Sequence, residues 1–232
     1  MSNINLEHCL SFINSQTLPG TRTDRDNALR RAVTISRQAG CGAAQVAEAV
    51  ANYLQRHLPR PGIAWTVFDR NLMEKVLDDH CLPANLAHIL AEDRVSEFED
   101  VLAETFNLRP HTRTIVQHTT ETMLQLADCG SVILIGRAGN IITAKLPHVL
   151  HVRLVAPLDD RIERICYADH KSPAVARQFC LEEDAARARY VKTYFKADIN
   201  DPLQYHLVIN TSRTGCENAG RLIGDAVLGM KV

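Results

Sequence analysis

A short strand, a glycine turn and a helix follow one another directly between residues 32 and 47. Residues 32–36 are small or β-branched, and after Gly42 the apolar residues recur at helical spacing. Gly40 and Gly42 allow backbone angles that a Cβ disfavours, so successive N–H groups can converge on an anion at the start of the helix. This layout predicts a phosphate-binding loop, with a nucleotide as its ligand, made of Gly40, Cys41, Gly42, Ala43 and Ala44.

The loop departs from the standard phosphate-binding pattern at two positions. In the pattern GxxxxGK[ST], a lysine follows the last glycine and a hydroxyl residue follows the lysine. Here those positions hold Ala43 and Ala44. Neither side chain can contact a γ-phosphate or Mg²⁺, so positive charge for bound phosphates has to come from other residues.

Five short apolar segments alternate with segments of helical periodicity along the chain. The predicted strands are residues 32–36, 65–68, 131–135, 149–155 and 205–210. The predicted helices include residues 46–54, ended by Pro59 and Pro61, and residues 71–79, 173–194 and 217–228. Strands that alternate with helices form a parallel sheet covered on both faces. We therefore expect an α/β fold, a three-layer sandwich around a five-stranded parallel sheet.

The length of the chain fits one domain with an appendage. The 232 residues can bury a substantial core, and no low-complexity linker divides them. Residues 1–30 predict a helical appendage with a polar connector, and residues 31–232 form the expected domain. Between the second and third strands, residues 83–127 have helical periodicity only, which predicts a helical insert.

Charge and cysteine usage exclude several classes of partner. The 26 Lys and Arg balance 27 Asp and Glu, which gives no electrostatic attraction to long nucleic acid or an acidic membrane. The seven cysteines are scattered, odd in number and without a CxxC pair, as expected of a reduced, cytoplasmic protein. No signal peptide or membrane span is predicted. The ten histidines do not have the pattern of a metal site. Monomer and homo-oligomer both remain open.

Ligands of such sheets bind beyond the carboxyl ends of the strands. This rule selects the segments that follow the predicted strands, namely residues 36–44, Asp69, residues 136–140, residues 156–157 and residues 210–211. The first and third of these segments contain the most specific chemistry, because each combines glycines with an arginine.

With these segments in view, the chain resembles the cytidylate kinase-like family of P-loop nucleoside monophosphate kinases from about Ala32 to Leu228. The segments behind the resemblance are Ile35-Ser36-Arg37, Gly40-Cys41-Gly42, Phe68-Asp69-Arg70, Ile135-Gly136-Arg137, residues 151–157, Asp184, Arg187, Tyr190, Tyr194, Asp201 and residues 205–211. The resemblance implies a P-loop nucleotide kinase fold with the helical insert and a helical lid over about residues 166–196. It also implies an enzyme that transfers a phosphoryl group from ATP with Mg²⁺ to a nucleoside monophosphate, CMP or dCMP.

In the more distant cytidylate kinases, a Gly-Arg-Asp turn after the third strand contacts the acceptor phosphate. The resemblance transfers this role to Gly136 and Arg137, whereas the Asp position holds Ala138. A lid Asp and an Arg three residues later correspond to Asp184 and Arg187.

Three arginines are the expected catalytic residues, because phosphoryl transfer requires alignment and positive charge more than covalent chemistry. Arg37 would partly replace the missing lysine, and Arg137 would hold the acceptor phosphate with a bidentate fork. Arg187 would neutralise charge on the transferring group from the lid. Asp69 and Gly136 would complete the acceptor side, with Asp69 contacting the nucleoside or a metal-bound water.

Each assignment has a structural alternative. The glycines can form an ordinary tight turn, Arg37 can pair with a surface carboxylate, and Arg187 can belong to a solvated helix face with i,i+4 pairs. Asp69 can simply cap the next helix. Two other functions therefore stay open. The alanines at 43 and 44 favour a degenerate nucleotide-binding or regulatory module, and Ala138 favours a kinase of another small molecule.

Overall fold

The computed structural model describes residues 30–69 and 110–231. Within these ranges, five parallel strands form one sheet in the order β2-β3-β1-β4-β5. The strands are β1 (Ala32–Arg37), β2 (Thr66–Phe68), β3 (Val132–Ile135), β4 (Val149–Val155) and β5 (Leu207–Asn210). Strand β1 is central, because Ile35 pairs with Ile135 on one side and with Val152 on the other. The predicted five-stranded parallel sheet is confirmed.

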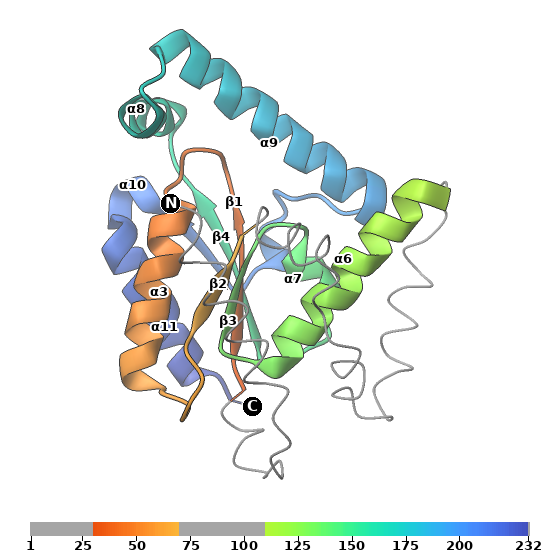
Figure 1. Ribbon diagram of the computed structural model, residues 1–232. Coiled ribbons are helices and arrows are strands. Elements are labelled where there is room, and N and C mark those ends of the chain that lie inside the picture. The colour runs from red at the N-terminus through yellow and green to blue at the C-terminus, as the bar shows by residue number, and fades with distance from the viewer. Residues whose placement is uncertain (1–29, 70–109, 232) are drawn as a thin grey trace.

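Helices cover both faces of the sheet (Figure 1). On one face lie α3 (Ala43–His57) and α11 (Cys216–Gly229), and on the other lie α6 (Pro110–Cys129) and the short α7 (Gly139–Ile142). Two further helices, α8 (Leu158–Asp169) and α9 (Pro173–Phe195), extend across the edge at which β1 and β4 end. The remaining elements are the 3₁₀ turn η3 (Pro202–Gln204) and α10 (Thr211–Thr214). The architecture is the predicted three-layer sandwich.

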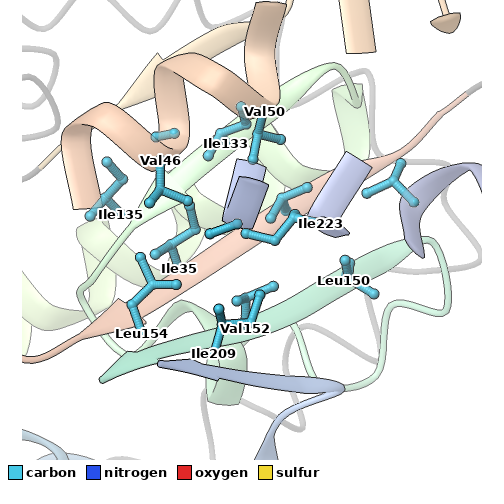
Figure 2. Close-up of a cluster of buried hydrophobic side chains, with 14 of the residues drawn as sticks. Ile35, Val46, Val50, Ile133, Ile135, Leu150, Val152, Leu154, Ile209 and Ile223 are labelled. Carbon is cyan, nitrogen blue, oxygen red and sulfur yellow. The ribbon is translucent and has the colours of Figure 1, made fainter. Parts of the chain in front are cut away.

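The core beneath α3 and α11 explains why the segment after the glycine turn is helical. Val46, Val50 and Leu54 are fully buried at helical spacing, and each such side chain contributes about 1.5–3 kcal/mol by leaving water. Figure 2 shows Val46 and Val50 facing the apolar side chains of β1, β3 and β4, and Leu54 belongs to the same cluster. Helix α3 ends at His57, just before Pro59, as predicted.

The opposite face has a separate apolar cluster under α6. It contains Phe68 of β2, Leu134 of β3, and Met123 and Leu126 of α6, all almost fully buried. The two clusters together hold the sheet between its helical layers, so the strand ends that form the site are fixed by packing on both faces.

Three predicted strands begin later than expected. Trp65 is buried but lies before β2, and its N–H donates to Gln55 Oε1 at 2.9 Å. Ser131 has a φ of 57°, so β3 begins at Val132. Asp201 caps η3 by accepting from the N–H of Leu203, which leaves β5 to begin at Leu207. A hydrogen bond to a side chain of α3, a left-handed residue and a capped 3₁₀ turn therefore override β-propensity at the starts of these three strands.

Several predictions lie outside the described residues. These are the appendage up to residue 29, the helix over 71–79 and the part of the helical insert before residue 110. The described part of the insert is helical, and α6 continues two residues beyond the predicted end to Cys129. In the predicted lid, α9 begins after Ser172, whose hydroxyl accepts from the N–H of Val175, and Pro173 occupies its first turn.

Candidate active site

The turn between β1 and α3 has left-handed backbone at both glycines. Gly40 and Gly42 have φ of 77° and 74°, and Gly42 is the N-cap of α3. Because Gly42 has no side chain to cap the helix, the first N–H groups of α3 have no helical partner. The N–H groups of Ala43 and Ala44 belong to this first turn, at the positive end of the helix dipole.

Neighbouring elements pack closely against the loop. A Cβ at Gly40 would lie 2.7 Å from the Arg161 carbonyl oxygen, and one at Gly42 would lie 2.6 Å from Cys216 Sγ. Cys41 is buried, and its thiol donates to the Leu154 carbonyl at 3.5 Å. Burial raises the pKa of this thiol to about 11. Cys41 is therefore a small residue that fills a small space, and its thiolate is not available at neutral pH.

A cavity of about 240 Å³ lies between the ends of β1 and β3 and helix α9. It is lined by Ser36, Arg37, Gly136, Arg137, Ala138, Asn140, Glu183, Ala186, Arg187, Tyr190, Val191 and Ile199. All three predicted catalytic arginines and Gly136 are in this set. The five loop residues and Asp69 do not line this cavity. The predicted catalytic arginines and the predicted phosphate-binding loop therefore belong to separate parts of the site. We call this space the arginine cavity.

Arg37, the last residue of β1, extends over Gly136. A Cβ on Gly136, whose φ is 88°, would clash with the Arg37 guanidinium. The pKa of Arg37 is lowered to about 10, mainly by burial and also by the charges of Arg187 and Arg137, while the charges of Glu183 and Asp69 oppose this shift. The group therefore stays protonated at neutral pH. Within residues 30–69 and 110–231 it forms no hydrogen bond or ion pair, so the surface ion pair that the sequence offered as an alternative is absent from this part of the chain.

Arg137 sits in the turn between β3 and α7. Arg137 and Ala138 have φ of 52° and 58°, two successive left-handed residues that are not glycine. Such backbone costs about 1–3 kcal/mol per residue and is concentrated at functional sites. The Arg137 guanidinium acts on the Tyr190 hydroxyl on α9, because its positive charge favours a lower pKa of this phenol. The net effect of burial is nevertheless to raise the pKa of Tyr190, which keeps the phenol neutral.

Arg187 lies on α9 and is held by carboxylates of its own helix. Its guanidinium contacts Glu183 Oε2 at 2.8 Å and Asp184 Oδ1 at 3.4 Å. The i,i+4 pair that the sequence offered as an alternative is therefore present, and Arg187 still lines the cavity.

Asp184 connects this helix to the loop. Its carboxylate accepts from the N–H of Ala39 at 2.7 Å and from Arg161 Nη1 at 2.7 Å. Arg161 in turn donates to the Ala39 carbonyl at 3.0 Å. The peptide of Ala39 is thus clamped on both sides by α8 and α9, which positions the residues just before Gly40. Sequence reasoning marked Asp184 through the resemblance, but it missed Arg161 because the clamp joins residues more than 120 positions apart.

Sequence reasoning also missed Arg153. This side chain of β4 is 5% exposed and donates to Ser36 Oγ at 2.8 Å, at the wall of the arginine cavity. The available signal was an arginine inside an otherwise apolar strand, a position at which charged residues are rare.

Asp69 follows β2 directly and is exposed. Its negative charge acts on Arg37, whose pKa it raises. In the described ranges, no group of three or more His, Cys, Asp or Glu residues is arranged to hold a metal ion. None of the helices described there combines the length and hydropathy needed to cross a bilayer.

A five-stranded parallel sheet with a glycine loop between its central strand and the following helix, two helices across the strand ends and arginines at those ends defines a protein of the P-loop kinase fold. The chain belongs to the cytidylate kinase-like family, whose model matches residues 32–213.

Individual relatives match the chain at modest sequence identity and over different lengths. The chain is 25% identical to the cytidylate kinase of Methanocaldococcus jannaschii over 177 residues, which cover 74% of this chain and 95% of that protein. It is 29% identical to a uronate isomerase of Corynebacterium glutamicum over 110 residues, 47% of this chain. The chain spans only 21% of the length of that protein.

Among solved structures, an uncharacterized protein from Eubacterium ventriosum has a similar fold. The TM-score is 0.67 at 16% sequence identity, and the alignment covers 85% of this chain and 98% of that one. At this identity the likeness concerns the fold alone.

Proposed function

We propose that the protein is a nucleotide kinase that transfers the γ-phosphoryl group of ATP to a nucleoside monophosphate. The observation that carries the proposal is Arg37. Its guanidinium is half-buried, faces a cavity that Arg137 and Arg187 also line, and forms no hydrogen bond or ion pair with the described residues. Burial of an unpaired cation is unfavourable, so an anionic ligand is the natural complement of this cavity.

Each predicted residue has a role that its position supports. The N–H groups at the start of α3 would hold phosphates of the donor. Arg137 would bind the acceptor phosphate, and Arg187 would turn from Glu183 to the transferring group, because both line the same cavity. Arg37 would provide the positive charge between donor and acceptor that Ala43 does not.

Mg²⁺ would enter as part of the ATP complex, as substrate. Ala44 offers no hydroxyl ligand, and the described residues include no cluster of three acidic, histidine or cysteine side chains for a resident ion. Asp69 is the carboxylate at the end of β2, and it would contact the acceptor or a water of the magnesium shell.

CMP or dCMP is the proposed acceptor. The support is membership of the cytidylate kinase-like family and the match to a cytidylate kinase along 95% of that protein's length. Ala138, where the acceptor turn of cytidylate kinases has Asp, is the residue that would alter this preference.

The alternative is a nucleotide-binding module without phosphoryl transfer. Ala43 and Ala44 favour it, and so does the close packing of Arg161 and Cys216 against the loop. This module would be stabilised by nucleotides without converting them.

The test is turnover of purified protein with MgATP and a panel of nucleoside monophosphates, followed by separation of the products. We expect ADP and a nucleoside diphosphate, with CMP or dCMP the best acceptor. Arg37→Met should lower turnover at least about 100-fold, the effect of removing a group that stabilises transition-state charge. It should also stabilise the ligand-free protein by about 1–3 kcal/mol, because a buried cation is replaced by an apolar side chain.

Arg56→Met, at an exposed position near the end of α3, is the matched control and should change neither quantity. Nucleotide-dependent thermal stabilisation without turnover of any acceptor would reject the kinase and favour the nucleotide-binding module. Absence of both would remove the proposal.

A further inference from the structure

Arg153 is a buried cation whose contacts within the described residues are with neutral groups. It donates to Ser36 Oγ at 2.8 Å and to Asn200 Oδ1 at 2.9 Å, and its guanidinium lies 5.9 Å from the centre of the Tyr205 ring. No carboxylate of the part of the chain that the structure describes lies within ion-pair distance of it. Its positive charge is therefore hydrogen-bonded but not neutralised.

The neutral contacts fix this charge at the wall of the arginine cavity. Ser36 pairs with Arg153 across β1 and β4, and its hydroxyl lines the cavity. The Tyr205 hydroxyl lies 3.3 Å from Ser36 Oγ and donates to the Ile199 carbonyl at 2.9 Å. The guanidinium thus lies directly behind one wall residue, and the wall itself is held by hydrogen bonds on two sides.

The position of the charge matters because the surroundings screen it poorly. In a partly desolvated site, two charges interact several times more strongly than in water. Arg37 and Arg153 flank the end of β1. Arg153 is buried and Arg37 is half-buried, and neither forms an ion pair with a carboxylate of the described residues. An anion in the cavity feels both groups, and the energy of each interaction is proportional to the charge on the anion.

We propose that Arg153 is a positioning and specificity-determining residue that makes the arginine cavity select a doubly charged phosphate monoester over a singly charged anion. The proposal rests on the proposed function in placing a phosphate in this cavity, and it deepens it by assigning the charge selectivity of the acceptor site to Arg153. A singly charged carboxylate would gain about half as much from the Arg153 charge as a doubly charged phosphate, and an uncharged hydroxyl would gain nothing from it.

Binding of two matched probes tests the proposal without any turnover. At pH 8, phenyl phosphate carries two negative charges, since its second pKa is about 6, and phenyl sulfate carries one. Isothermal titration of the full chain should show tighter binding of phenyl phosphate. In Arg153→Met the affinity should fall about 10-fold for phenyl phosphate and about 3-fold for phenyl sulfate, because loss of one positive charge affects a dianion twice as strongly in free energy.

Asn200→Asp separates charge from structure. This substitution keeps an oxygen acceptor at the position that receives the Arg153 hydrogen bond but adds a negative charge that pairs with the guanidinium. If the Arg153 charge sets selectivity, Asn200→Asp should lower the phosphate-to-sulfate affinity ratio as Arg153→Met does, in a protein at least as stable as the parent. Arg153→Lys should retain most of the ratio. Ser36→Ala should weaken both probes equally, because the charge remains.

A purely structural Arg153 predicts a different result. Arg153→Met would then weaken both probes equally and lower the melting temperature, and Asn200→Asp would leave the ratio unchanged. Either result overturns the proposal. The binding test is independent of catalysis. If the protein shows no kinase turnover but its charge selectivity depends on Arg153, this inference is retained and the proposed function is rejected. Turnover of nucleoside monophosphates, together with a phosphate-to-sulfate affinity ratio that Arg153→Met leaves unchanged, would retain the proposed function and reject this inference.

Discussion

Gly136 and Arg37 share one corner of the arginine cavity, and the position of each depends on the other. Arg37 can lie over the turn after β3 only because Gly136 has no Cβ, and the φ of 88° at Gly136 suits glycine alone among the residues. Arg137 and Ala138, the next two residues, also have positive φ. The turn therefore stores backbone strain where a charged group has to be aimed at a ligand.

Gly136→Ala should remove Arg37 from its position. We expect CMP binding to weaken at least about 10-fold, the equivalent of one charge-assisted hydrogen bond. The free energy of unfolding should fall by about 2–4 kcal/mol through the clash and the positive φ. Calorimetric titration and urea unfolding measure the two effects.

Gly62→Ala is the matched control, because Gly62 also has a positive φ of 74° but no atom within 4 Å of an added Cβ. It should cost about 1 kcal/mol of stability and leave CMP binding unchanged. Equal effects of the two substitutions on binding would contradict the account of Gly136.

At the scale of elements, α9 is a largely polar helix attached to the domain through few residues. Only Ala176, Cys180 and Val191 are buried along its 23 residues. The contacts of Asp184 with the Ala39 N–H and with Arg161 therefore contribute a large part of its attachment to the loop. Because Arg187 follows Asp184 by one turn, the same contacts set the position of Arg187.

Asp184→Ala should detach α9 from the loop. It leaves Arg161, 7% exposed in its side chain, without its carboxylate, and the Ala39 N–H without its acceptor. We expect a loss of about 3 kcal/mol in the free energy of unfolding and faster hydrogen exchange in α8 and α9 than in the sheet.

Asp169→Ala removes a carboxylate from a more exposed pair with Lys171 on the same helical lid. Its effect on stability should be below about 1 kcal/mol. An equally small effect of Asp184→Ala would show that the clamp does not hold the lid.

At the scale of the whole molecule, polar residues interrupt the core on the face of the sheet that α6 and α7 cover. Thr34 of β1 and His151 of β4 are both buried there, and Thr34 Oγ1 lies 2.9 Å from His151 Nδ1. Burial, together with the charge of His206, lowers the pKa of His151 to about 4. The folded protein therefore keeps this imidazole neutral at pH values at which the unfolded chain protonates it.

This difference predicts a loss of stability in mild acid. The contribution of neutral His151 to the free energy of unfolding is complete above pH 6.5. It decreases as the pH falls from about 6.5 to about 4 and does not change further below pH 4. It amounts to at most about 3 kcal/mol. Urea unfolding at pH 7.5 and pH 5 measures it. His151→Asn should flatten the slope between these pH values, and His57→Gln, at an exposed position on α3, should not. A slope unchanged in His151→Asn would assign the acid sensitivity to other groups.

Local patterns account for most of what could be predicted. The strands and helices followed from β-branched runs, from helical spacing such as that of Val46, Val50 and Leu54, and from prolines, because these signals depend on neighbours within a few residues. The errors fall at Trp65, whose N–H bonds to Gln55 of α3, and at Ser131 and Tyr205, where a left-handed residue and the end of a 3₁₀ turn replaced the start of a strand. The rule for parallel sheets then placed Arg37, Gly136 and Arg137 at one edge, and these residues do line one cavity.

By itself, the sequence determined the α/β class, the parallel sheet, the glycine turn and the strand ends that carry arginine. The tertiary structure decided that Arg37 lies half-buried over Gly136 with no ion pair to the described carboxylates, that Asp184 and Arg161 clamp Ala39, and that Arg153 supports the cavity wall through Ser36. The physical reason is that helical and strand periodicity arise within a few residues. The partner of a buried charge is instead set by which distant segments pack together, and a hydrogen bond between residues 117 positions apart leaves no local pattern.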